Sequence, residues 1–252
     1  MNNDLSPDVQ MQLMRPGQLE EAMRAFPVVY VPFGLIEWHG RHLPLGNDAL
    51  KAHAILVKTA EQFGGVVYPP VFYPSARHNK EGEFDTLDYE YKIPMVTELF
   101  TQLKKTGFRV IIGVSGHNII QQIQMIERGL DAVTADGTVA GAGLWEVTLS
   151  KCDDSATDHA AKWETSNMMF FYPDRVDLSA LGEGELAPGM KAPDGIGGLD
   201  PREHASAEVG QKNAELASKA IGEKAKELLE SLPEDKRAFS LEAISPEHWW
   251  LV

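Results

Sequence analysis

The sequence predicts an α/β fold with a mostly parallel central sheet, and three observations support this prediction. Residues 28–33 and 110–114 are short apolar runs of the kind found in strands that are buried on both faces. Residues 48–63 carry apolar side chains at helical spacing, and Gly64 and Gly65 end this pattern. A further apolar run follows at 66–71, so the chain contains a β-α-β unit whose strands should be parallel.

Further elements are predicted on both sides of this unit. Apolar spacing predicts helices at 18–26, 94–107, 119–135, 163–171 and 205–232, and another strand at 138–148. In the helix at 94–107, Met95, Leu99 and Leu103 are expected to form the buried face. Residues 181–202 are rich in Gly and Pro and are expected to be irregular.

Length and charge limit the domain count and the class of protein. The 252 residues suit one domain, with residues 1–26 as a lead-in and residues 240–252 as an apolar tail that docks on the domain or on a neighbouring subunit. The formal charge of −14 argues against nucleic acid as a partner. The N-terminus lacks the features of a secretory signal, and no apolar run approaches membrane-spanning length. We therefore expect a soluble, cytoplasmic enzyme with a small-molecule substrate.

The segment after the first predicted strand carries residues that typically bind metal ions. Glu37 and His39 are two residues apart, so their side chains leave extended backbone on the same face. His42 and Asp48 follow within the same segment, and a carboxylate such as Asp48 can bridge two cations. Imidazole and carboxylate without thiolate favour Zn, Mn or Fe in a site that is not a Cys-rich structural zinc site.

A second strand end brings another histidine to the same place. The strand at 110–114 runs directly into Ser115, Gly116, His117 and Asn118. Ligand sites of open α/β sheets lie outside the carboxyl ends of the strands, so His117 should arrive beside Glu37 and His39. The alternative is that Asp48 only caps a helix while Glu37 and His39 are solvated loop residues.

Two other regions leave their alternatives open. The polar stretch at 72–92 contains His78 and is expected to be an ordered flap or an oligomer contact, although His78 also suits a solvated loop. His159 and Glu164 are five residues apart, about 140° around a helix, so they cannot share one helical face. Either His159 precedes the helix or the two residues serve different parts of a site, and spacing alone favours an ordinary exposed Glu164.

The chain resembles the creatininase family, the creatinine amidohydrolases, through four motifs in order. The family motif G-x-x-E-x-H-G-x-H-x-P-x-x-x-D is matched by Gly34, Glu37, His39, Gly40, His42, Pro44 and Asp48. A strand-end G-H motif corresponds to residues 115–118, and H-A-G-x-x-E-T-S corresponds to residues 159–166. A late G-D-P segment followed by A-[TS]-A-E is similar to residues 199–201 and 205–208.

The resemblance implies a three-layer α/β/α domain, usually a homo-oligomer and possibly a hexamer, with two divalent metal ions. By similarity, Glu37 and His117 would bind one ion, His39 the other, and Asp48 would bridge them. The glutamate that follows the strand-end histidine in creatininase is missing here, where Asn118, Ile119 and Ile120 stand. Glu164 is the natural substitute, so the resemblance overrides the interpretation from spacing.

The resemblance also implies hydrolysis of a carbonyl compound. Two adjacent cations lower the pKa of a water held between them, and the resulting hydroxide is predicted to attack the carbonyl. His159 is the predicted acid for the leaving group, with Asp158 beside it to orient it or to share the proton. The predicted substrate-binding residues are Arg41, His78, Trp145 and Asn118.

The expected substrate is a small ring, such as a cyclic amide. A ring diketone from inositol catabolism, of the 3-dehydro-scyllo-inosose type, is the alternative, because Arg41 stands where the family usually has proline and the amide-binding signature is incomplete. A protein of another class, a catalytically silent metal-binding or sugar-binding protein, is less favoured because every predicted ligand is present.

Overall fold

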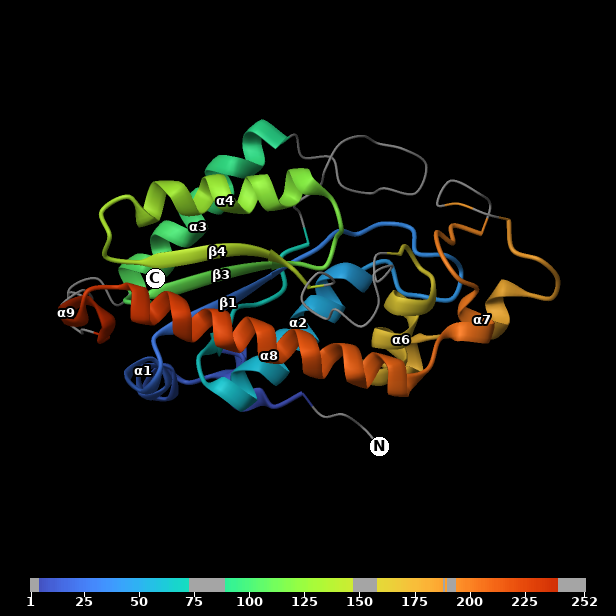
Figure 1. The fold of residues 1–252 in the computed structure, drawn as a ribbon, viewed down its shortest axis with the longest axis horizontal. Coiled ribbons are helices and arrows are strands. Elements are labelled where there is room, and N and C mark those ends of the chain that lie inside the picture. Colours follow the sequence, from blue (N-terminus) through green and yellow to red (C-terminus); the bar gives the residue numbers. More distant parts are fainter. Residues whose placement is uncertain (1–4, 73–88, 147–157, 188, 190–193, 240–252) are drawn as a thin grey trace.

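The computed structural model describes residues 5–72, 89–146, 158–187, 189 and 194–239, and within these residues four parallel strands form one sheet. The order across the sheet is β2-β1-β3-β4 (Figure 1). The strands are β1 (Val28–Phe33), β2 (Val66–Val67), β3 (Val110–Ser115) and β4 (Ala140–Trp145). The predicted parallel β-α-β unit is confirmed, because β1 pairs with β2 in parallel register.

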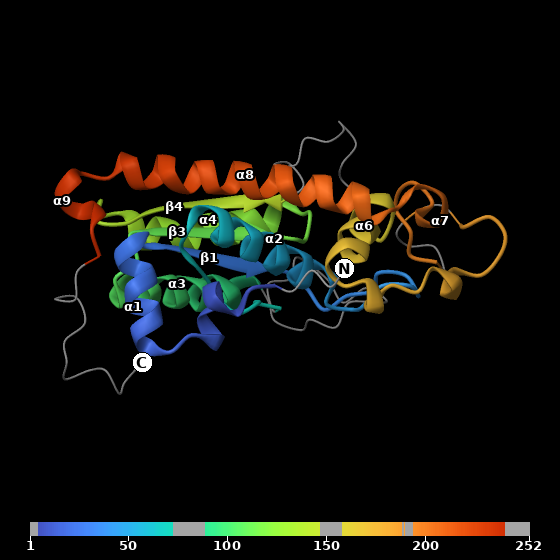
Figure 2. The same ribbon diagram turned by 90° about the horizontal axis from the view of Figure 1, so that it is seen from below.

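Helices cover both faces of this sheet and form the outer two of three layers. Figure 1 shows α3 (Tyr89–Thr106) and α4 (Ile120–Thr134) on one face, and α2 (Asn47–Phe63) and α8 (Ala207–Ser231) on the other. Figure 2 shows α8 and α3 on opposite sides of the strands. The other α-helices in the described residues are α1 (Pro16–Ala25), α6 (Lys162–Phe171), α7 (Pro201–His204) and α9 (Glu234–Arg237). The predicted three-layer α/β/α fold is therefore confirmed.

The strands are apolar on both faces because each face packs against helices. In β1, Val29 and Val31 belong to the apolar cluster formed with α3 and α4. Val28 and Tyr30 point the other way and belong to the cluster formed with α2 and α8. This alternation explains why β1 is a continuous apolar run, as parallel strands covered on both faces usually are.

Two predicted boundaries were wrong. The second strand was predicted at 66–71, but β2 ends at Val67 and only an isolated bridge between Val71 and Phe33 follows. Pro69 and Pro70 explain the break, because proline has no N–H to donate to a neighbouring strand. The stretch at 72–92 was predicted as a loop, but its residues 89–92 already form the first turn of α3.

The buried face of α3 also differs from the prediction. Met95 is 38% exposed, while Val96, Phe100 and Leu103 are buried against the sheet. Leu99 packs partly buried against the same cluster, so of the three predicted positions only Met95 faces away from the sheet. The predicted tail at 240–252 lies outside the described residues. None of the helices in the described part of the chain has the length and apolarity needed to cross a lipid bilayer.

Candidate metal centre

Acidic and imidazole side chains from four segments meet beyond the carboxyl ends of β1 and β3. Glu37 and His39 follow β1, His117 follows β3, Asp48 lies in the first turn of α2, and Glu164 lies in the first turn of α6. The side chains are buried, with exposed fractions between 0% for Asp48 and 6% for Glu37, apart from the partly buried His117. The sequence prediction that these residues converge at one rim of the sheet is thus met by the structure.

Two glycines allow the start of α2 to lie against the strand ends. A Cβ on Gly34, just after β1, would lie 2.1 Å from the backbone nitrogen of Ala49. A Cβ on Gly116, just after β3, would lie 2.1 Å from the backbone oxygen of Asp48. Only glycine permits an approach this close. The backbone of α2 therefore fixes the Asp48 carboxylate between the ends of β1 and β3.

The Asp48 carboxylate faces two different histidines with its two oxygens. Asp48 Oδ1 lies 3.0 Å from His39 Nε2, and Asp48 Oδ2 lies 3.2 Å from His117 Nδ1. Glu37 Oε1 lies 3.0 Å from His117 Nδ1, and Glu164 Oε2 lies 3.4 Å from His39 Nε2. The site therefore contains two groups with the spacing of metal ligands, Glu37/Asp48/His117 and His39/Asp48/Glu164, which share Asp48.

The donor atoms of this site fit a metal ion better than they fit one another. His39 Nδ1 lies 3.3 Å from the backbone oxygen of Glu37, which can only accept, so Nδ1 carries the proton of a neutral ring. His39 Nε2 is then an acceptor with one lone pair, yet it faces carboxylate oxygens of Glu37, Asp48 and Glu164 within 3.5 Å, and these oxygens also accept. His39 Nε2, Glu37 Oε1 and Asp48 Oδ2 are buried without a hydrogen-bond partner in the described residues. A bound cation would satisfy all of these atoms at once.

Without a cation, protons take over part of this charge balance. Burial alone would lower the pKa of His39, but Asp48 and Glu164 beside it raise that pKa to about 9. Burial likewise opposes protonation of His117, while the adjacent carboxylates of Asp48 and Glu37 raise its pKa to about 10. Burial would raise the pKa of Asp48, but the two histidines hold it well below its usual range. A cation that binds here must displace these protons.

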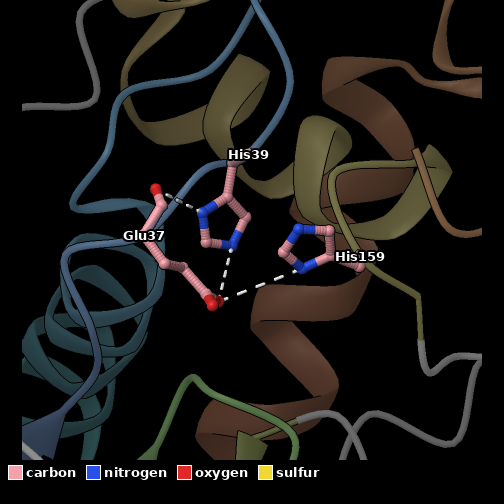
Figure 3. A group of neighbouring side chains, drawn as sticks. All are labelled: Glu37, His39 and His159. Atoms are coloured by element: carbon pink, nitrogen blue, oxygen red, sulfur yellow. Dashed lines mark hydrogen bonds and ion pairs between the residues drawn. The ribbon is translucent and has the colours of Figure 1, made fainter. Parts of the chain in front are cut away.

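His159 lies beside the two groups, and one ring nitrogen faces them. Figure 3 shows His159 next to His39 and Glu37; the two imidazole rings stack with centroids 4.5 Å apart. His159 Nε2 lies 2.8 Å from the backbone oxygen of Trp38, so Nε2–H donates and Nδ1 is left for the site. Nδ1 lies 3.9 Å from Glu37 Oε1, and Glu37, His39 and His159 form a third group with ligand spacing.

His159 precedes α6, which answers the question that the spacing left open, and Asp158 caps this helix. One Asp158 oxygen accepts from the backbone N–H of Trp163 at 2.6 Å, and the other accepts from that of Glu164 at 3.3 Å. Burial, together with the nearby Glu164, raises the pKa of Asp158 to about 7. These hydrogen bonds connect Asp158 to the start of α6. They do not involve His159, so they do not support the predicted sharing of a proton between Asp158 and His159.

Sequence reasoning missed two buried charged residues that support Glu164. Lys51 Nζ lies 2.5 Å from Glu164 Oε1 and 2.9 Å from Glu146 Oε1. Burial would lower the pKa of Lys51, but Glu146 and Glu164 raise the pKa of this ammonium group. Burial raises the pKa of Glu146, although Lys51 acts to lower it. Glu164 Oε2 accepts from the backbone N–H of Ala160 at 2.7 Å. The available signal was that Lys51 lies one helical turn after Asp48 and so shares its face.

The other predicted residues are distributed around the site. Asn118 and Trp145 are half-buried, and they lie just after β3 and at the end of β4, the same rim as the ligand groups. Arg41 is exposed, and His78 lies outside the described residues. His42 does not face the ligand groups: its Nε2 lies 2.9 Å from Thr165 Oγ1, a contact that ties the segment after β1 to α6.

Comparison with known proteins points to one family. Residues 12–232 match the family described as creatininase, creatinine amidohydrolase. Creatinine amidohydrolase of Pseudomonas putida is 25% identical over 178 residues, which cover 61% of this chain and 68% of that protein. A mycofactocin precursor peptide peptidase of Mycolicibacterium smegmatis is 32% identical over 170 residues, covering 64% of this chain and 65% of that protein.

Solved structures share the fold. A crystal structure of creatinine amidohydrolase superposes with a TM-score of 0.74 at 21% identity, covering 88% of this chain and 99% of that one. Matching creatininase structures include a manganese form, with a TM-score of 0.71, and a zinc–zinc form of a mutant, with a TM-score of 0.69. At 21% identity these two show the fold alone for this chain, while their descriptions name the metals that those proteins carry.

Proposed function

The chain belongs to the creatininase family and is a metal-dependent hydrolase, and from this premise we propose that it uses two divalent cations to open a small cyclic amide. One observation carries the proposal. The two oxygens of Asp48 face His39 and His117, which come from different strand ends, and each histidine has a further carboxylate beside it. A single cation would leave one of these two ligand groups unused.

We propose that Glu37, Asp48 and His117 hold one cation, and that His39, Asp48 and Glu164 hold the other. Imidazole and carboxylate ligands suit Zn, Mn or Fe, and creatininase structures with manganese and with zinc support the first two. Such cations supply two things when bound, a polarised substrate carbonyl and a water of lowered pKa.

His159 is the proposed acid that protonates the leaving group. The Trp38 carbonyl fixes the proton of a neutral ring on Nε2, which leaves Nδ1 to hold or give up a proton on the side of Glu37 and His39. Stacking on His39 holds the ring in this orientation. Asp158 contributes indirectly, because it caps α6 and so helps to place Glu164.

An amide is the favoured substrate class because the names of both matched relatives describe amide hydrolysis, of creatinine in one case and of a precursor peptide in the other. The 32% identity to the peptidase makes a peptide amide the second candidate. The ring diketone ranks behind both because neither name describes such a reaction. Asn118, Trp145, Arg41 and His78 stay the proposed substrate-binding residues.

A hydrolysis screen tests this proposal. Cyclic amides, formamides, oxidised inositols and short peptides are offered to tag-free protein with added Mn²⁺ or Zn²⁺. We expect turnover of a cyclic amide that is abolished by Glu37→Gln and by His117→Ala, and retained by His204→Ala, which removes an exposed histidine. Turnover of linear peptides alone would refute the small ring. Well-folded protein that binds no cation would favour a catalytically silent binder. Cytoplasmic location and homo-oligomeric assembly stay predictions.

A further inference from the structure

Lys51 is a buried cation held between two carboxylates from two different elements. It lies on α2, has no exposed surface, and contacts Glu164 of α6 on one side and Glu146, the residue after β4, on the other. Glu146 is only 1% exposed. Charges removed from water in this way are stable only when opposite charges compensate them.

The two oxygens of Glu164 have separate tasks. Oε1 faces the Lys51 ammonium, while Oε2 faces His39 Nε2 at 3.4 Å and accepts from the Ala160 N–H. With Glu164 as its only partner, Lys51 would cancel the charge of a proposed metal ligand. With Glu146 as a second partner, the three side chains keep one net negative charge at the site.

We propose that Glu146 is the counter-charge of Lys51 and so leaves the negative charge of Glu164 available to a cation. This inference rests on the proposed two-cation site and concerns only the cation held by His39, Asp48 and Glu164. Among the described residues Lys51 forms ion pairs with Glu164 and Glu146, and Glu164 belongs only to the second group, whereas Glu37 and His117 form no ion pair with Lys51. Glu146 therefore acts through Lys51 without touching the cation, and it sets the affinity of one cation relative to the other.

Isothermal titration of tag-free, chelator-treated protein with Mn²⁺ and with Zn²⁺ tests the proposal. In Glu146→Gln we expect one of two binding events to weaken by about 10–100-fold, the range usual for residues around a metal's ligands, while the other is unchanged. The matched control is Asp136→Asn. Asp136 pairs with Lys104 at 2.7 Å and precedes β4, so this variant removes the same charge at the opposite end of the same strand. It should bind both cations like the wild type.

The double variant Lys51→Met/Glu146→Gln separates charge from positioning. It removes the cation together with its counter-charge, and the Ala160 N–H still holds Glu164. We expect it to recover the weakened event to within a few-fold of the wild type. The same variant carries the test if Glu146→Gln does not fold, because it leaves no buried lysine without its counter-charge.

Three results would overturn the inference. Glu146→Gln that binds both cations like the wild type would show that Glu146 carries no charge that matters to the site. A double variant that stays as weak as Glu146→Gln, or weaker, would make Lys51 a positioning residue and not a compensated charge. A wild-type chain with fewer than two binding events would overturn this inference and the proposed function together, whereas the first two results leave the proposed function intact.

Discussion

Replacing Asp48 with asparagine should remove most of the stabilisation that cations give this protein. Asp48 is the one residue shared by both ligand groups, and its two oxygens lie 3.0 and 3.2 Å from the two histidine nitrogens. Asparagine keeps the shape but loses the charge and one acceptor oxygen. Both sites should therefore weaken at once, whereas loss of Glu37 or Glu164 weakens one of the two proposed sites.

The size of the effect follows from binding linkage. A cation at 100 times its Kd stabilises the folded chain by about 2.7 kcal/mol per site, so two sites give about 5 kcal/mol. For a chain of this length that corresponds to an increase in Tm of roughly 10–20 °C. Loss of a residue that only supports a ligand weakens a site by up to about 100-fold, and loss of a ligand should cost at least as much. A weakening of each site by about 100-fold leaves about 0.4 kcal/mol per site at the same cation concentration and a shift of only about 2–3 °C.

Thermal unfolding of chelator-treated protein with and without Mn²⁺ or Zn²⁺ measures this shift. Because each variant is compared with itself, any effect of the substitution on folding cancels. The control Asp136→Asn removes a carboxylate from the ion pair with Lys104, which is not part of the ligand groups, and should keep the full cation-dependent shift in Tm. A cation-dependent shift in Asp48→Asn as large as in the wild type would refute the bridging role.

Three further predictions follow from the same geometry. His159→Gln should lower kcat by about 10²–10⁴-fold while cation content by elemental analysis stays unchanged; loss of a cation would instead make His159 a ligand. Cation binding at pH 7.5 should release up to about two protons, because the pKa values of His39 and His117 are raised to about 9 and 10 and both rings are protonated until cations displace the protons. Calorimetry in buffers of different ionisation enthalpy counts the released protons. A count of zero contradicts the ligand assignment. Gly116→Ala should weaken cation binding without removing any ligand, because its Cβ would lie 2.1 Å from the Asp48 carbonyl oxygen. Gly17→Ala should not weaken binding, because a Cβ there meets nothing within 4 Å. Calorimetry with both variants decides whether the close approach of Gly116 to Asp48 matters.

The sheet and its rim could be predicted because their signals are local. The apolar runs of β1 and β3 and the glycine after each run identify the strands and their carboxyl ends. The rule that ligand sites lie outside those ends then places Glu37, His39 and His117 together without any knowledge of distances. Boundaries that depend on packing were less predictable, as the early start of α3 at Tyr89 shows.

The support of the site could not be predicted from the sequence because it depends on tertiary contacts. A lysine in the second turn of an amphipathic helix is typical of a solvated face, yet Lys51 is fully buried. Its partner Glu146 lies 95 positions away on another element, and neither residue belongs to a motif. Glu164 shows the same limit, because its spacing from His159 suggested an exposed residue and only the resemblance to a family indicated a ligand.

Metal content measured by elemental analysis on tag-free protein tests the central claim most directly. The wild-type chain should contain about two equivalents of Zn, Mn or Fe, and Glu164→Gln about one, because Glu164 belongs to one of the two ligand groups. Folded wild-type protein without metal, or Glu164→Gln that keeps two equivalents, would contradict the assignment of two cations that share Asp48.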